Sequence, residues 1–199
     1  MKILAFTDTH CSELAHIRIK KKIIKENPDL LISCGDLSNF SRGLESSAKF
    51  FNSFDKPCLI IPGNHETEEE IKKICIKYKN LINLHANSYQ KEDFFFCGFG
   101  RGGFSLREEK FEKFAKKFIP TIPKEKHLVF ITHAPIYGTK LDDLWEEHRG
   151  CLSTLEFIEK TKPVLVLCGH FHENAGKQDK IKNTLVLNPG PSGKIINLE

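Results

Sequence analysis

Short runs of apolar residues recur along the whole chain, and each has the length of one β-strand. Several of them are apolar at every position, which is typical of strands that are covered on both faces. The predicted strands cover residues 2–6, 30–33, 57–61, 94–97, 128–131, 164–168 and 185–187. The pattern therefore predicts a sheet-containing core in which most strands are buried.

Helical patterns lie between these runs. The spacing i, i+3, i+4, i+7, which places apolar side chains on one helix face, occurs twice. It is found at Ile71, Ile74, Cys75 and Tyr78, and again at Phe111, Phe114, Ala115 and Phe118. A shorter stripe over 152–158 and the segment 12–26 are also expected to be helical. Strands that alternate with helices from the first residue predict an α/β architecture with largely parallel strands.

The end of the chain breaks this alternation. Residues 185–187 and 194–198 flank the turn-rich NPGPSG and leave little room for a helix. The two runs are expected to form an antiparallel hairpin, which would make the sheet system mixed. No linker, repeat or low-complexity stretch interrupts the chain, so residues 1–199 are expected to form a single domain.

The composition excludes several classes of protein. The chain has 199 residues, of which 40% are apolar and 28% charged, as in ordinary soluble domains. No apolar run approaches the roughly 18 residues of a membrane span, and MKILAF meets Thr7 and Asp8 too soon for a signal peptide. Seven cysteines without a CxxC pair indicate buried thiols and a cytoplasmic location. A net charge of +4 gives little support for binding to nucleic acid, which stays open.

Polar side chains follow five of the predicted strands, at the point where each strand ends. They are Asp8 and His10, Asp36, Asn64 with His65 and Glu66, His133, and finally His170 and His172. In open α/β sheets, ligands bind in the crevice outside the carboxyl ends of the strands. We therefore expect these carboxylate, amide and imidazole groups to converge on one region.

The types and spacing of these residues indicate a metal site. In an extended segment, residues i and i+2 point to the same side, so Asp8 with His10 and His170 with His172 can act in pairs. Oxygen and imidazole donors without thiolate fit Mn²⁺, Fe, Zn²⁺, Ni²⁺ or Co²⁺ better than Ca²⁺ or Mg²⁺. The set is too large for one tetrahedral ion and is about right for two divalent ions.

In their order along the chain, these blocks also resemble the signature of a known family. DTH, GD, GNHE, the histidine of THAP, and GHFH resemble the five blocks of the calcineurin-like metallophosphoesterases, over residues 8–172. CGHFHENAG followed by NTLVLNPGPSG is similar to small prokaryotic members. The resemblance implies a four-layer αββα sandwich with two mixed β-sheets.

The resemblance also implies a role for each residue. Asp8, His10, Asp36 and His172 would hold one metal ion, and Asp36 would bridge to a second ion completed by Asn64, His133 and His170. His65 would stand beside the phosphate as the general acid. Glu66 replaces the aspartate most common in the family and would orient that imidazole across one extra methylene. A hydroxide bridging the two ions, manganese being preferred, would then attack phosphorus.

The predicted function is metal-dependent hydrolysis of a phosphoester, with a small or nucleotide-like phosphodiester preferred as substrate. A phosphomonoesterase or protein phosphatase, a nuclease, and a non-catalytic scaffold with the same fold are the alternatives, and a homodimer stays open. One further motif, GFGRGG at 98–103, matches the dinucleotide pattern GxGxxG. The next strand ends in Ile131, Thr132 and His133 without an acid, so a glycine-rich turn is the better interpretation.

Overall fold

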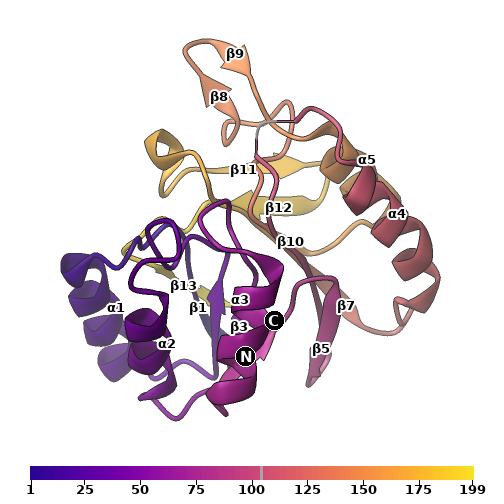
Figure 1. Cartoon of the computed structure of the whole chain (residues 1–199). Coiled ribbons are helices and arrows are strands. Elements are labelled where there is room, and N and C mark those ends of the chain that lie inside the picture. The colour runs from indigo at the N-terminus through magenta and orange to yellow at the C-terminus, as the bar shows by residue number, and fades with distance from the viewer. Residues whose placement is uncertain (104) are drawn as a thin grey trace.

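Two β-sheets lie face to face, and helices cover the outer face of each. The computed structural model describes residues 1–103 and 105–199. Figure 1 shows α1, α2 and α3 on one side of the molecule and α4 and α5 on the other, with the strands between them. The four-layer α/β sandwich with two mixed sheets that the family resemblance implies is confirmed.

The first sheet has five strands in the order β13-β1-β2-β3-β4, and β13 alone runs antiparallel to its neighbour. The strands are β1 (Lys2–Phe6), β2 (Leu30–Ser33), β3 (Cys58–Ile60), β4 (Leu81–Asn83) and β13 (Lys194–Asn197). The helices that follow three of them are α1 (Glu13–Glu26), α2 (Leu44–Asn52) and α3 (Glu68–Lys77). A capping box between Thr67 and Glu70 fixes where α3 begins.

The second sheet has six strands in the order β11-β12-β10-β7-β6-β5, with antiparallel strands at both edges. They are β5 (Asn87–Lys91), β6 (Phe94–Phe99), β7 (His127–Thr132), β10 (Leu165–Leu167), β11 (Gln178–Ile181) and β12 (Thr184–Leu187). The helices of this half are α4 (Glu109–Phe118) and α5 (Leu152–Thr161), with short helical turns η1 (Ile119–Thr121) and η2 (His172–Asn174). A small hairpin of β8 (Asp143–Leu144) and β9 (Glu147–His148) projects beyond this sheet (Figure 1).

Alternation along the strands explains the layers. In β1, Ile3 and Ala5 join the apolar cluster between the two sheets, whereas Leu4 and Phe6 join the cluster under α1, α2 and α3. A third cluster packs Phe111 of α4 and Phe157 of α5 against the outer face of the second sheet. Burial on both faces makes the strands apolar at every position, as the sequence pattern indicates. In the described residues, no helix is both long and apolar enough to cross a membrane.

The hairpin predicted near the end of the chain is wrong. Residues 184–187 form β12 in the second sheet, whereas residues 194–197 form β13 beside β1 in the first, with Leu4 opposite Ile195. A strand has only two edges, and those of β12 are already paired with β10 and β11. The segment between them therefore crosses from one sheet to the other, and Gly190 accepts a hydrogen bond from the Thr7 amide on the way.

Candidate metal centre

All seven predicted ligands lie together where the strands of the two sheets end. The loops after β1, β2 and β3 bring residues from the first sheet, and those after β7 and β10 bring residues from the second. The loop residues are Asp8, His10, Asp36, Asn64, His133, His170 and His172. Three overlapping groups of acids and histidines here have ligand atoms within 4.8 Å of one another. A centre of this kind joins the two halves of the sandwich.

The first group is formed by Asp8, His10 and His172. The Nε2 atoms of His10 and His172 face each other at 3.1 Å, and His172 Nε2 lies 3.7 Å from Asp8 Oδ1. The carboxylate of Asp8 is held by the backbone N–H of His170, at 3.2 Å from Oδ1 and 3.0 Å from Oδ2. Two imidazole nitrogens and a carboxylate that converge in this way suit a transition-metal ion.

Another group has Asp8, Asp36 and His133 as its members, and the side chains of Asn64 and His170 lie next to its His133. The side-chain oxygen of Asn64 lies 2.9 Å from His133 Nε2 and 2.9 Å from His170 Nδ1. Burial, together with the nearby His133 imidazole, lowers the pKa of His170 to about 4. His170 is therefore neutral near pH 7, as a metal ligand must be.

Asp36 lies between His10 and His133. Its Oδ1 accepts a hydrogen bond from the His65 amide at 2.9 Å, whereas Oδ2 lies 3.8 Å from His10 Nε2 and 3.5 Å from His133 Nε2. Burial by itself would raise the pKa of Asp36, but His133 and His65 outweigh this effect and hold the pKa at about 2. Oδ1 is thus held by a backbone hydrogen bond, whereas Oδ2 faces the Nε2 atoms of His10 and His133.

Backbone carbonyls fix the orientation of two imidazoles. His10 Nδ1 lies 3.0 Å from the carbonyl of Ser38, and His133 Nδ1 lies 2.8 Å from that of Cys34. Because a carbonyl only accepts, each Nδ1 carries hydrogen and each Nε2 is directed into the centre. A metal-binding histidine is commonly oriented by a carbonyl in this way.

His133 carries a proton when no metal ion is bound. Its burial would lower the pKa, but the carboxylates of Asp36 and Asp8 overcome this and raise the pKa to about 9. Metal binding at Nε2 must therefore release this proton near pH 7. A metal cation can therefore take the place of the proton on His133 Nε2.

The backbone at the centre differs from the extended geometry that the sequence spacing suggested. Asp8, His10, Asp36 and His170 all have left-handed φ angles, of 53°, 44°, 53° and 74°. The extended backbone expected for these pairs is therefore wrong, whereas Asp8 and His10 still belong to one ligand group and all four side chains reach the centre. Such conformations cost on the order of 1–3 kcal/mol each and cluster at functional sites.

Glycines allow the loops to approach the ligands closely. A Cβ atom on Gly63 would lie 2.0 Å from Asp36 Oδ1, and one on Gly169 would lie 2.0 Å from the Thr7 hydroxyl. Gly35, at φ 103°, would bring its Cβ to 2.6 Å from the Gly63 amide nitrogen. Any side chain at these positions would displace the loops that carry the ligands.

His65 differs from the ligand histidines in its tautomer. The backbone N–H of Phe40 donates to His65 Nδ1 at 3.0 Å, so the ring hydrogen of the neutral form is on Nε2. That nitrogen faces the centre, 3.8 Å from Asp36 Oδ2. A ring held in this way is a hydrogen-bond donor to the centre rather than a metal ligand.

Glu66 has a different environment from the one expected. Its carboxylate is 1% exposed and accepts hydrogen bonds from the amides of Asp36, Ser38 and Gly63 at 2.8–3.0 Å and from the Ser38 hydroxyl at 2.6 Å. The amide of Phe40, rather than this carboxylate, orients the His65 ring. The carboxylate of Glu66 thus connects the loop that carries Asp36 to the loop that carries Asn64 and fixes their geometry.

Sequence reasoning did not identify the groups that orient the histidines. They are the carbonyls of Cys34 and Ser38 and the amide of Phe40, all in or just after the loop that carries Asp36. Backbone groups are present at every residue, so no pattern of side chains could have marked them.

Comparison with known proteins agrees with this geometry. Residues 1–174 match the calcineurin-like phosphoesterase family. A protein of Methanocaldococcus jannaschii is 31% identical over 98% of this chain and 91% of its own length, and its function is uncharacterized. The chain belongs to the calcineurin-like phosphoesterase family. Family membership implies a phosphoester hydrolase that uses divalent metal ions.

One further relative and two solved structures extend the comparison. A probable glycerophosphodiester phosphodiesterase of Arcobacter nitrofigilis is 31% identical over 75% of this chain, which spans only 58% of that protein. The crystal structure of TT1561 from Thermus thermophilus has the same fold, with a TM-score of 0.76 at 16% identity, over 95% of this chain and 88% of that one. An archaeal phosphodiesterase superimposes with a TM-score of 0.54 at 21% identity, over 96% and 84% of the two chains.

Proposed function

We propose that the protein is a phosphodiesterase with a dinuclear centre of divalent metal ions. Asp8, His10, Asp36 and His172 would hold one ion, and Asp36, Asn64, His133 and His170 the other. The observation that carries the proposal is the position of Asp36 Oδ2, between His10 Nε2 at 3.8 Å and His133 Nε2 at 3.5 Å. Manganese, iron, zinc, nickel and cobalt all suit this donor set.

The bound ions would supply Lewis acidity toward the phosphoryl group and activation of water as the nucleophile. The protein itself supplies a rigid frame for the ligands. Glu66 ties the Asp36 loop to the Asn64 loop through three amides, and the carbonyls of Ser38 and Cys34 set the ring orientations of His10 and His133. Substitution of a group that holds a metal ligand in this way commonly lowers metal affinity or activity by about 10- to 100-fold.

His65 would act on the departing oxygen of the substrate. Its Nδ1 accepts the Phe40 N–H, so the hydrogen of the neutral ring is on Nε2, the nitrogen that faces the centre. The Nε2–H group is then a hydrogen-bond donor to the negative charge that develops on the leaving oxygen, a role that neutral imidazoles perform in other enzymes. Loss of one such donor costs about 10²–10³ in rate.

His65→Ala should therefore impair substrates with poor leaving groups far more than activated nitrophenyl esters. The measurement is kcat/KM for a series of phosphodiesters whose leaving alcohols differ in pKa, with wild type and variant loaded with the same metal. An equal loss across the series would remove this role from His65.

The preference for diesters is supported by two relatives whose names describe phosphodiesterases. Purified protein with Mn²⁺, Ni²⁺, Zn²⁺ or no added metal, given a nitrophenyl phosphodiester and the matching monoester, tests the proposal. We expect metal-dependent hydrolysis, faster for the diester. Hydrolysis mainly of the monoester would reverse the preference, and no hydrolysis with any metal would favour a non-catalytic scaffold.

A further inference from the structure

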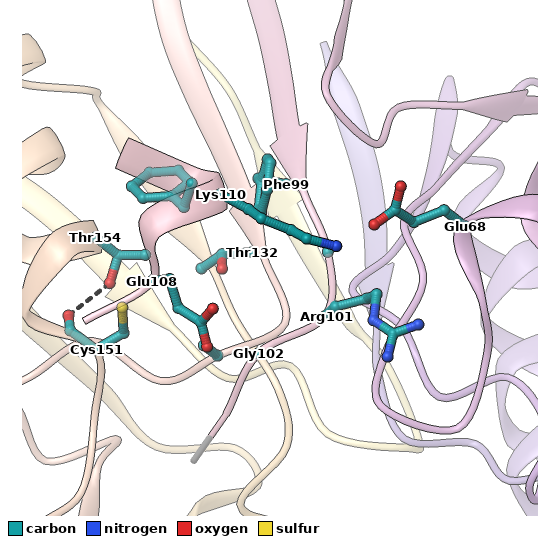
Figure 2. A pocket seen from close by; sticks show the side chains of 12 residues that line it. Glu68, Phe99, Arg101, Gly102, Glu108, Lys110, Thr132, Cys151 and Thr154 are labelled. Carbon is teal, nitrogen blue, oxygen red and sulfur yellow. Dashed lines mark hydrogen bonds between the residues drawn. The ribbon is translucent and has the colours of Figure 1, made fainter. Parts of the chain in front are cut away.

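A cavity of about 270 Å³ lies between the first turn of α3 and the second half of the molecule, and Figure 2 shows the side chains that line it. It is enclosed by the first turn of α3, the glycine-rich segment after β6, the first turn of α4, the end of β7 and the beginning of α5. These segments come from both sheets, so the cavity lies in the same interface as the metal ligands. Its walls include the glycine-rich motif for which the sequence offered no function.

Chain connections show how close the cavity is to the ligands. Gly102 lines the cavity, and a Cβ atom on the next residue, Gly103, would lie 2.5 Å from the Nε2 atom of His170. Ala134, which also lines it, directly follows His133. The cavity and the metal centre are thus separated by little more than one strand of backbone. A substituent of a phosphoester bound at the centre is within reach of this space.

The inner wall of the cavity is mostly apolar. Phe111, Ala134 and Cys151 are buried there, and the rings of Phe99 and Phe111 meet edge to face at 5.2 Å between centroids. The hydroxyl of Thr154 donates to the carbonyl of Cys151, so this donor is already used by the fold. Such a wall accommodates an apolar body and offers aromatic faces to a cation.

Glu108 brings a carboxylate into this apolar space. Figure 2 shows it between Cys151 and Arg101, and its Oε1 lies 3.2 Å from where a Cβ of Gly102 would be. The residue is half-buried, and its own amide donates to the Ser153 hydroxyl at 3.1 Å, which fixes its position at the start of α4. Among residues 1–103 and 105–199, its carboxylate has neither a hydrogen bond nor an ion pair. A half-buried acceptor of this kind is suited to a donor on a ligand.

Two cations lie at the exposed edge of the cavity. In Figure 2, Lys110 extends toward Glu68 and Arg101 lies below them, and neither cation forms an ion pair with another described residue. The Arg101 amide donates to the Pro62 carbonyl at 2.8 Å, which places this edge directly next to the loop that carries Asn64. Positive charge there attracts the phosphate of a substrate, while the carboxylate lies deeper.

We propose that this cavity binds one of the two alcohol substituents of the phosphodiester, and that Glu108 selects a substituent that ends in a protonated amine. The proposal rests on the phosphodiesterase function proposed above. In the reaction, water forms the new bond to phosphorus, one P–O ester bond breaks, and the departing oxygen leaves as an alcohol. The ammonium group takes no part in that step, so its effect is on binding and specificity.

Two nitrophenyl phosphodiesters with the same leaving group test this proposal. One carries 3-aminopropyl and the other carries butyl as the second substituent, so they differ only in the terminal ammonium or methyl group. We expect wild type to prefer the aminopropyl ester in kcat/KM by about tenfold to a hundredfold, the size of one charge-assisted hydrogen bond. Glu108→Gln should remove this preference, because it keeps the shape of the side chain but loses its charge.

Glu109→Gln is the matched control. Glu109 is the next residue on the chain, its side chain is 85% exposed, and it pairs with Lys113 on the outer surface of α4. This variant should keep the wild-type preference. Each preference is a ratio between two esters measured on the same protein, so a general loss of activity cancels.

The outcomes separate this proposal from the proposed function. If bis(nitrophenyl) phosphate is hydrolysed but wild type does not distinguish the two esters, or if Glu108→Gln retains the preference, the assignment of the cavity is wrong. If no diester is hydrolysed, the proposed function fails, and calorimetric binding of 3-aminopropyl phosphate and butyl phosphate to the metal-loaded protein makes the same comparison. Equal affinities would then contradict the role of Glu108.

Discussion

The metal centre and the cavity beside it are neighbours with opposite constructions. In the centre, Asp8, Asp36 and His133 are buried, and each has at least one atom bound to the backbone of another loop. In the cavity, the charged groups Arg101, Glu108 and Lys110 are exposed or half-buried and have no ion pair among the described residues. The centre is fixed before any ligand arrives, whereas the cavity offers charges that a ligand would satisfy.

This difference indicates a division of labour. Catalysis needs donors that do not reorganise during the reaction, and the backbone contacts of the centre provide that. Specificity needs groups that lose free energy when the wrong substrate leaves them unpaired, and Glu108 is such a group. Changes in the centre should therefore affect every substrate, and changes in the cavity should affect only some.

Asp36→Asn should have the largest effect. The variant keeps an oxygen for the His65 amide but removes the charge that lies between His10 and His133, so we expect loss of metal binding and a decrease of more than about 1000-fold in kcat/KM for every phosphoester. Metal content and activity are measured on the same sample, with circular dichroism to establish that the variant folds. Near-normal turnover would contradict the metal centre described here.

Glu66→Gln should have the next largest effect, without touching a ligand directly. The carboxylate of Glu66 accepts hydrogen bonds from three backbone N–H groups. In the glutamine variant, one of its oxygens is replaced by an NH₂ group, which is a donor and cannot accept from them. We expect about 10- to 100-fold weaker metal binding and a loss of about 1–3 kcal/mol in the free energy of unfolding. Glu69→Gln, at an exposed position in the first turn of α3, is the control and should leave both quantities unchanged.

The stability of the metal-free protein should fall as pH rises from 6.5 to 8. His133 has a pKa raised to about 9 in the folded state, so its contribution is complete below its unfolded pKa of 6.5 and is lost as pH rises toward 9. The expected loss over this window is on the order of 2 kcal/mol. Urea denaturation across the window measures it, and bound metal should remove the dependence because it replaces the proton. A His133→Gln variant with the same pH dependence would show that another group is responsible.

Arg101→Ala should have the smallest effect. An exposed cation at the edge of the cavity acts on the substrate through solvent, so we expect KM to rise by a few-fold, less at high salt, with kcat unchanged. Lys113→Ala, which removes an exposed cation of α4 outside the cavity, is the control. A large decrease in kcat would show that Arg101 acts in the reaction itself. It would contradict the assignment of catalysis to the metal centre and of specificity to the cavity.

The sequence predicted an α/β architecture and the ligand region because both follow from local patterns, whereas the four layers were implied by the resemblance to the family. Burial on both faces makes strands such as 30–33 continuously apolar, and the polar groups that follow five strands meet because parallel strands end at the same edge. Helix α2 was not predicted, although Leu44, Ala48 and Phe51 lie on its buried face. The fold class is confirmed, whereas a single domain over 1–199 and the roles of the site residues stay predictions.

Features that depend on distant partners could not be read from the sequence. Whether 194–197 pairs with β12 or with β1 depends on which strand edges are already occupied, and that is decided by β10 and β11. The cavity likewise draws Glu108, Thr132 and Cys151 from segments that no short motif connects. The contacts of Glu66 likewise depend on the amides of Asp36, Ser38 and Gly63, which only the fold brings together.

Titration of the metal-free protein with Mn²⁺ tests the central claim most directly. Bound metal per chain, the electron paramagnetic resonance signal and phosphodiester hydrolysis are followed on the same samples. The account predicts saturation at two ions per chain, a signal from magnetically coupled ions, and activity that reaches its maximum with the second ion. Full activity at one ion per chain, with no coupled signal at any ratio, would contradict it.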